Sequence, residues 1–208
     1  MKRDSDHPLA DFQPSRRWQA HWIWADGDGH EKNSYCYFRR EFRVARGPAA
    51  VTIYITADTR YQLFVNGRRV GRGAPQSKPY YHYYDEYRLD SFLKAGVNCV
   101  AIIGYHLGTL METRAGVLAE VVDGAGKVLA ATDASWRVNR AGAWQSWTYN
   151  LQGNKITPFQ EFFDARGVPE GWEKPGFDDS GWGAGSVFDW PPSYGNCPFS
   201  RLVQRDIP

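Results

Sequence analysis

A run of tyrosines with interspersed polar residues, Tyr80–Tyr87, has the residue types best suited to ligand chemistry in this sequence. On a β-strand successive side chains point to opposite sides, so Tyr81, Tyr83 and Asp85 share one face and His82 lies on the other. Tyrosine rings stack on the C–H face of a sugar, and their hydroxyls, with Asp85 and His82, bond its hydroxyl groups. The alternative is that these rings are ordinary core and edge residues. We predict carbohydrate binding at Tyr81, His82, Tyr83 and Asp85.

Two tryptophans nearer the C-terminus, Trp144 and Trp147, form a second candidate platform for a sugar. An indole ring offers an apolar face and one N–H donor. Rings in irregular segments also bury themselves simply to cover a core, and this alternative stays open. We add Trp144 to the predicted carbohydrate-binding residues.

Cleavage of a glycosidic bond requires two carboxyl groups about 5–9 Å apart across a pocket. Three acidic clusters are available: Asp85–Glu86, Asp178–Asp179, and Glu161 with Asp164. Neighbours on a strand point to opposite faces, so the first pair cannot face one substrate. The second pair precedes Ser-Gly-Trp and is typical of a turn. We therefore predict no catalytic carboxylate pair in this chain.

Nucleophile motifs and metal-ligand spacings are missing as well. The sequence has no G-x-S-x-G motif, and its five histidines do not have the spacing of zinc ligands. Asp26–Gly29 faintly resembles a calcium loop but lacks the oxygen spacing and the terminal glutamate. The residues by themselves predict neither a catalytic residue nor a metal site.

The charge balance excludes some classes of partner. The chain has 208 residues, with 25 Lys and Arg against 23 Asp and Glu, for a net charge of +2. A field this weak does not favour nucleic acid or an anionic membrane as the main partner. Aromatic residues make up 15% of the chain, which suits both a β core and a sugar-binding surface.

The cysteines indicate a reducing compartment. Cys36, Cys99 and Cys197 are odd in number and show no C-x-x-C spacing. No apolar run of 18 residues occurs, and the first residues lack the apolar region of a secretion signal. We expect a cytoplasmic protein.

The candidate residues must be positioned by strands, because helical periodicity is scarce. Alternating or apolar runs separated by Gly, Asn and Pro signals predict six or more short strands, and Asn66–Gly67 is a strong hairpin signal. Such spacing predicts an all-β, antiparallel β-sandwich or jelly roll. The expected strands cover residues 35–44, 50–57, 60–71, 97–105, 116–122, 127–131 and 135–139.

Differences in composition and periodicity along the chain predict three regions. Residues 1–34 form an N-terminal aromatic segment, and residues 35–140 form the sandwich. Residues 141–208 hold seven of the twelve prolines and five of the nine tryptophans, with little periodicity. We expect this last region, called the strap below, to pack on the sandwich as an irregular segment.

Several motifs, in this order, resemble a known family. ADTRYQLFVNGRRVG (57–71) is followed by YYDEYRLDSFLKAGVNCVAI (83–102), TDASWRV (132–138), EFFDARGVPEGWEKPGFDDSGW (161–182) and RLVQRDIP (201–208). The series resembles the galactose-binding-like jelly roll at the front of bacterial α-L-rhamnosidases of glycoside hydrolase family 78. The resemblance runs from about Trp22 to Pro208.

The resemblance implies a non-catalytic accessory domain that supports or positions carbohydrate for a catalytic barrel elsewhere in the same polypeptide. The implied partners are that barrel and rhamnose-containing glycans. Some related modules bind rhamnose with calcium, although their ligand residues have no match in this sequence. No catalytic residue carries over.

Three other functions stay open. The chain could be an independent module that binds rhamnose or galactose-type sugars, or the accessory domain of a β-galactosidase-like enzyme, since the VNG core occurs there too. It could also be an enzyme itself, which the missing carboxylate pair argues against.

Overall fold

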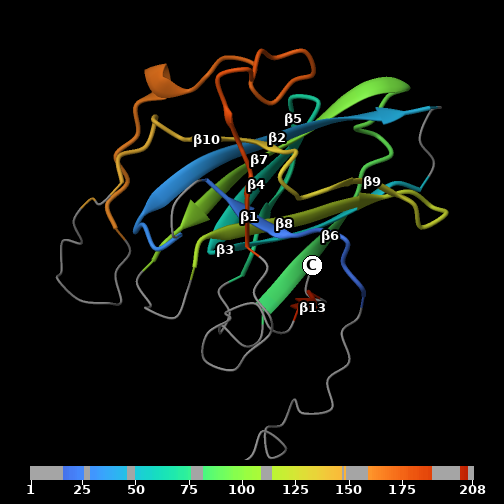
Figure 1. Ribbon diagram of the computed structural model, residues 1–208, viewed down its shortest axis with the longest axis horizontal. Helices are drawn as coiled ribbons and strands as arrows, with labels where there is room; N and C mark the ends of the chain where they lie inside the picture. The colour runs from blue at the N-terminus through green and yellow to red at the C-terminus, as the bar shows by residue number, and fades with distance from the viewer. Residues whose placement is uncertain are drawn as a thin grey trace, which may run out of the picture.

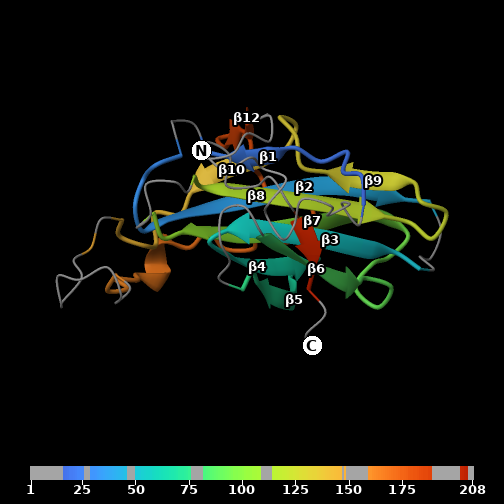
Figure 2. The ribbon, with the colours of Figure 1, turned by 90° about the horizontal axis from the view of Figure 1, so that it is seen from below.

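The computed structural model describes residues 16–25, 29–45, 50–75, 82–108, 114–146, 148, 159–188 and 202–205. In these ranges the chain forms two β-sheets packed face to face, which form an upper and a lower layer in Figure 1 and lie one in front of the other in Figure 2. Helical structure there is limited to one 3-10 turn, η2 (Ala165–Gly167). The predicted all-β sandwich is confirmed.

The first sheet, called the β2 sheet below, has six strands in the order β11-β10-β2-β7-β4-β5. Its centre is an antiparallel pair in which β2 and β7 stay in register from end to end. Its strands are β2 (Ser34–Val44), β4 (Arg60–Val65), β5 (Arg68–Gly73), β7 (Gly96–His106), β10 (Arg137–Arg140) and β11 (Gly183–Ala184).

The second sheet, called the β3 sheet below, follows the order β12-β1-β8-β3-β6-β13, with β9 beside β8 (Figure 1). All its pairs are antiparallel except that β13 adds to β6 in parallel. Its strands are β1 (Trp22–Trp24), β3 (Thr52–Asp58), β6 (His82–Arg88), β8 (Gly116–Val122), β9 (Val128–Ala131), β12 (Ser186–Phe188) and β13 (Leu202–Gln204).

Local sequence explains the strand ends. Asn66 and Gly67 both have positive φ, 51° and 80°, as the predicted hairpin between β4 and β5 requires. Another hairpin joins β8 to β9, where the Asp123 carboxylate accepts hydrogen bonds from the backbone N–H groups of Ala125 and Lys127.

The core explains why β7 is apolar on both faces. Val100 and Ile102 lie in the main core between the two sheets. Cys99, Ala101 and Ile103 point to the outer face, where a second apolar cluster covers them. A strand buried on both sides needs a continuous apolar run instead of alternation, and residues 97–105 have such a run.

The strap supplies the cover for that outer face. Trp172 and Trp182 are both buried there and pack on Tyr37 of β2, with ring centroids 4.6 and 6.0 Å away. Figure 1 shows this part of the strap in orange beside β10. Its short strands pair with earlier strands: β11 with β10, β12 with β1 and β13 with β6. No helix in the described part of the chain is long and apolar enough to cross a membrane.

Candidate functional site

Strand β6 carries three of the predicted sugar-binding residues, whereas Tyr81 lies outside the described residues. Asp85 lies opposite Ile55 of β3, a core residue, so this face of β6 points between the sheets. The Asp85 side chain is buried, forms an ion pair with Arg205 of 2.5 Å (Nε to Oδ1), and accepts a hydrogen bond from the Tyr61 hydroxyl. Burial, followed by the charge of Asp85, raises the pKa of Tyr61, which keeps this phenol a donor.

The close approach of Asp85 to the β2 sheet depends on glycine. A Cβ on Gly73 of β5 would meet the Asp85 carboxylate and come within 2.8 Å of the Tyr61 ring. A Cβ on Gly71 would meet the Tyr87 ring. The Gly-x-Gly spacing in β5 therefore admits two β6 side chains.

The other face of β6 is covered by the N-terminal segment. His82 is 6% exposed, and its Nε2 lies 3.1 Å from the Ala57 carbonyl oxygen. Burial lowers the pKa of His82, although the charge of Asp58 opposes the shift. Next to it, the Tyr84 ring packs edge-on against Trp18 at 5.3 Å.

Tyr83 is half-buried, and its carbonyl accepts a hydrogen bond from Thr56. His82 thus lies on the opposite side of β6 from Tyr83 and Asp85. Their role in sugar binding stays a prediction.

Trp144 belongs to a row of aromatic rings on the outer face of the β2 sheet. Tyr35 and Tyr105 are opposite each other on β2 and β7, with ring centroids 4.4 Å apart. The Trp144 ring stacks on the Tyr35 ring, with centroids 4.8 Å apart and an interplanar angle of 12°. The Phe163 ring packs against Trp144 with centroids 4.6 Å apart. The Trp144 indole N–H donates to the Glu161 carboxylate at 2.8 Å. The ring that the sequence singled out is therefore fixed on both its apolar and its polar side.

This row borders a hollow of about 640 Å³ between the strap, β4, β5 and β7, which we call the strap cleft. Its volume lies in the range of small-molecule sites. Aromatic and charged side chains line it, among them Tyr35, Arg60, Tyr105, Trp144, Glu161 and Arg205.

The polar groups of the strap cleft lie next to its rings. Burial raises the pKa of Tyr105 to about 12 and that of Tyr35 further; Glu161 adds to both shifts and Arg60 opposes them. Both phenols therefore stay protonated and can donate. Phenol hydroxyls, a carboxylate and a guanidinium around aromatic rings form a set that can bind the hydroxyl groups of a sugar.

Most of these residues were missed from the sequence. Tyr35, Tyr105 and Arg60 come together through the register of three strands, and Glu161 and Arg205 arrive from the strap. The available signal was that residues 35 and 105 each lie in an expected strand, which shows that each tyrosine points to one face of its strand but not that the two tyrosines point to the same side of one sheet.

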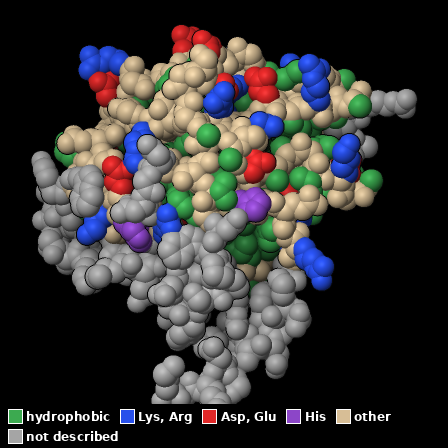
Figure 3. Space-filling view, viewed as in Figure 1, with side chains coloured by type: hydrophobic (Ala, Val, Ile, Leu, Met, Phe, Trp, Pro, Cys, Tyr) green, Lys and Arg blue, Asp and Glu red, His purple; other side chains and the backbone are tan. Residues whose placement is uncertain are grey.

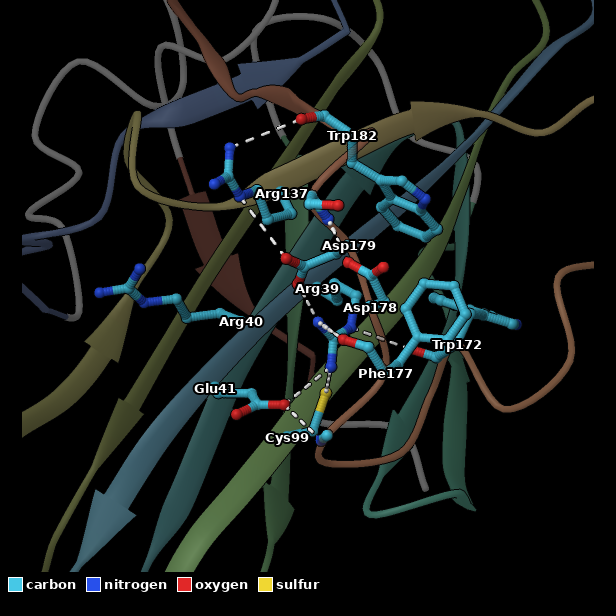
Figure 4. A network of polar contacts seen from close by, with 12 residues as sticks. Arg39, Arg40, Glu41, Cys99, Arg137, Trp172, Phe177, Asp178, Asp179 and Trp182 are labelled. Atoms are coloured by element: carbon cyan, nitrogen blue, oxygen red, sulfur yellow. Dashed lines mark hydrogen bonds and ion pairs between the residues drawn. The ribbon is translucent and has the colours of Figure 1, made fainter.

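A second hollow, of about 520 Å³, surrounds Arg39 of β2. Figure 4 shows that guanidinium between the carboxylates of Asp179 and Glu41. Arg39 also donates to the carbonyl oxygens of Trp172 and Lys174, both at 3.0 Å. Arg137 lies 3.7 Å from Asp179 (Nε to Oδ1). Because these charges satisfy one another, this network attaches the strap to the sheet and is not a free binding site.

Metal ligands do not gather in the described part of the chain. No group of three or more His, Cys, Asp and Glu side chains there could hold a metal ion. Asp26 and Asp28, of the faint calcium-loop motif, lie outside the described residues. Figure 3 shows acidic and basic side chains interspersed over one face of the molecule.

Comparison with known proteins agrees with the fold. Residues 46–198 match the family described as the alpha-L-rhamnosidase N-terminal domain. An alpha-L-rhamnosidase of Streptomyces avermitilis is 29% identical over 159 residues, which are 69% of this chain and 15% of that protein. The crystal structure of a glycoside hydrolase family 78 rhamnosidase of Bacillus sp. GL1 is 36% identical, with a TM-score of 0.81 over 93% of this chain and 20% of that one.

A lectin from Pleurotus ostreatus, solved with GalNAc, shares the fold, with 21% identity and a TM-score of 0.60 over 88% of this chain and 45% of that one. This chain spans a fifth or less of the length of the two rhamnosidases. The family match covers the sandwich strands from β3 to β10 and the Arg39-bound part of the strap. The chain therefore belongs to the alpha-L-rhamnosidase N-terminal domain family.

Proposed function

We propose that this chain is a non-catalytic accessory domain of an α-L-rhamnosidase and that it binds carbohydrate in the strap cleft. The observation that carries the sugar-binding part is the combination of an aromatic row with the polar groups of Tyr35, Tyr105, Glu161 and Arg60 around one hollow. The family match supports the accessory role and favours a rhamnosidase over the β-galactosidase-like alternative.

The arrangement of carboxylates supports a non-catalytic role. Glu161 is the single acidic residue among the described residues that line the strap cleft, whereas glycoside hydrolysis uses two. Glu41 and Asp179 do line one hollow, but both bind Arg39. We expect no turnover of an aryl α-L-rhamnoside by the purified chain; turnover that Glu161→Gln abolishes would overturn the non-catalytic part of the proposal.

Sugar binding is tested by calorimetric titration with L-rhamnose and rhamnosyl oligosaccharides. We expect saturable binding with a dissociation constant of about 0.1–10 mM. Tyr105→Phe removes one hydroxyl from the cleft and should weaken binding roughly two- to tenfold. Tyr54→Phe is the matched control, because Tyr54 lies on the β3 sheet and packs near Trp18, away from the cleft. Equal effects of the two variants would argue against this site.

A scaffold role without sugar binding is the second candidate. Phe162 and Phe163 of the strap are 44% and 50% exposed, and with Val187 they are the large apolar residues exposed in the described part of the chain. Adjacent exposed rings suit a contact with another protein domain. Phe162→Ser should then weaken association with a catalytic domain, and because Phe162 is not part of the aromatic row, any sugar binding should stay unchanged.

We also propose that the chain is divided into an N-terminal segment to residue 34, a sandwich to residue 140 and a strap thereafter. Among the described residues, Cys36 and Cys99 are buried and neither is in a disulfide, which suits a reducing compartment such as the cytoplasm.

A further inference from the structure

We infer that the strap cleft selects an acidic glycan, one whose sugar units carry a carboxylate, over a neutral one. This inference rests on the proposed sugar-binding function and names the class of ligand. It comes from the charges that line the cleft.

Four arginines line the strap cleft: Arg60 of β4, Arg69 and Arg72 of β5, and Arg205 beyond β13. Arg205 is neutralised by its ion pair with the buried Asp85. Arg60, Arg69 and Arg72 are exposed, and none of them forms an ion pair with a carboxylate in the described ranges. The cleft therefore carries an excess of positive charge.

The one acidic lining residue does not remove this excess. The Glu161 carboxylate accepts the Trp144 N–H, at the strap side of the cleft. A single carboxylate leaves at least two of the three unpaired guanidinium groups without a counter-charge among the described residues. In the Arg39 hollow, by contrast, Asp179 and Glu41 bind the central arginine. An unpaired arginine cluster beside a cleft is the arrangement that attracts an anion.

The chemistry of guanidinium indicates what kind of anion fits. Its planar N–H groups bind a carboxylate by two parallel hydrogen bonds, and the charge strengthens both. The adjoining phenols of Tyr35 and Tyr105 can in addition bond the hydroxyl groups of a sugar, which a simple inorganic anion lacks. Since Arg60 lies opposite Tyr105 in the β4–β7 register, one ligand can contact a ring, a hydroxyl and a guanidinium together. A sugar acid has all three matching features.

The test is a calorimetric titration of the chain with trigalacturonate and with its methyl ester, which has the same sugar skeleton but no charge. We expect the acid to bind at least about tenfold more tightly at low salt and the preference to shrink as salt rises. Arg60→Gln should weaken binding of the acid by about three- to tenfold and leave binding of the ester unchanged. Arg43→Gln, at an exposed arginine of β2 outside the cleft, is the control and should change neither.

The other outcomes of these titrations decide whether the inference, the sugar-binding proposal or both are wrong. Equal binding of acid and ester would overturn the inference and leave the sugar-binding proposal intact. Equal losses from Arg60→Gln and Arg43→Gln would mean nonspecific charge attraction and would overturn it too. A competition titration with sodium sulfate distinguishes two kinds of site. Sulfate competes fully with the acid at a general anion site and does not do so at a sugar-acid site. If no rhamnosyl or galacturonosyl ligand binds at all, both the inference and the sugar-binding proposal are wrong.

Discussion

The guanidinium of Arg39, within β2, forms an ion pair with the carboxylate of Asp179, 140 residues further along the chain. The Arg39 side chain is 1% exposed, so its charge depends on protein partners instead of water. It also donates hydrogen bonds to the Glu41 carboxylate and to the Trp172 and Lys174 carbonyl groups of the strap. One buried side chain thus attaches the GFDDSGW segment to the sandwich.

We expect Arg39→Met to destabilise the protein by about 3 kcal/mol, because it leaves two carboxylates and the carbonyl groups of the strap without this donor. Urea unfolding followed by tryptophan fluorescence measures the change, since Trp172 and Trp182 lie beside the network. Arg40→Met is the matched control: Arg40 makes one exposed hydrogen bond, to the Ser135 carbonyl, and its loss should cost less than about 1 kcal/mol. Equal costs would show that the network contributes nothing beyond a surface arginine.

Gly73→Ala should destabilise the protein by about 1–3 kcal/mol, since the new methyl group would collide with Asp85 and Tyr61. Gly142→Ala is the control, because nothing lies within 4 Å of an added Cβ at Gly142, and it should change stability by no more than about 0.5 kcal/mol. Thermal unfolding of the two variants and the wild type measures both changes in stability. A neutral Gly73→Ala would mean that β5 and β6 are further apart than described.

Stability should fall in mild acid because of His82. Burial depresses its pKa in the folded state below the ordinary value of 6.5, so the unfolded chain takes up a proton first as the pH drops. The stabilisation is complete above pH 6.5 and decreases below it, by at most about 1.4 kcal/mol per pH unit. Urea unfolding at pH 7.5 and 5.5 should show a smaller loss for His82→Gln than for the wild type. His21→Gln, at an exposed histidine, is the control and should lose as much stability between pH 7.5 and 5.5 as the wild type. If His82→Gln also loses as much stability as the wild type, the prediction is wrong.

Cys36 and Cys99 should resist thiol reagents in the folded protein. Both are buried, and burial raises the pKa of Cys99 to about 11, so roughly one Cys99 thiol in a thousand is ionised at pH 8. In a Cys197→Ser variant, we expect no rapid labelling by an aromatic disulfide reagent until denaturant is added, and then two labelled thiols. Rapid labelling of the native variant would show that the core opens readily.

Several features were determined by the sequence itself. The β4–β5 hairpin follows from Asn66–Gly67, because positive φ at both central positions favours these residues whatever lies around them. A continuous apolar run like that of β7 is typical of a strand buried on both faces, and Cys99 and Ile102 lie in separate clusters on its two sides. Local preference and periodicity are properties of the chain that need no partner.

The tertiary structure alone decided which side chains meet. Tyr35 and Tyr105 share a hollow because β2 and β7 pair in one register, and a shift by one residue would send one ring to the opposite face. Arg205 reaches Asp85 through a parallel addition of β13 to β6, and Glu161 reaches Trp144 through the course of the strap. The sequence pointed to Trp144 and Asp85 as single residues, but their partners lie far along the chain, where neither spacing nor periodicity carries information.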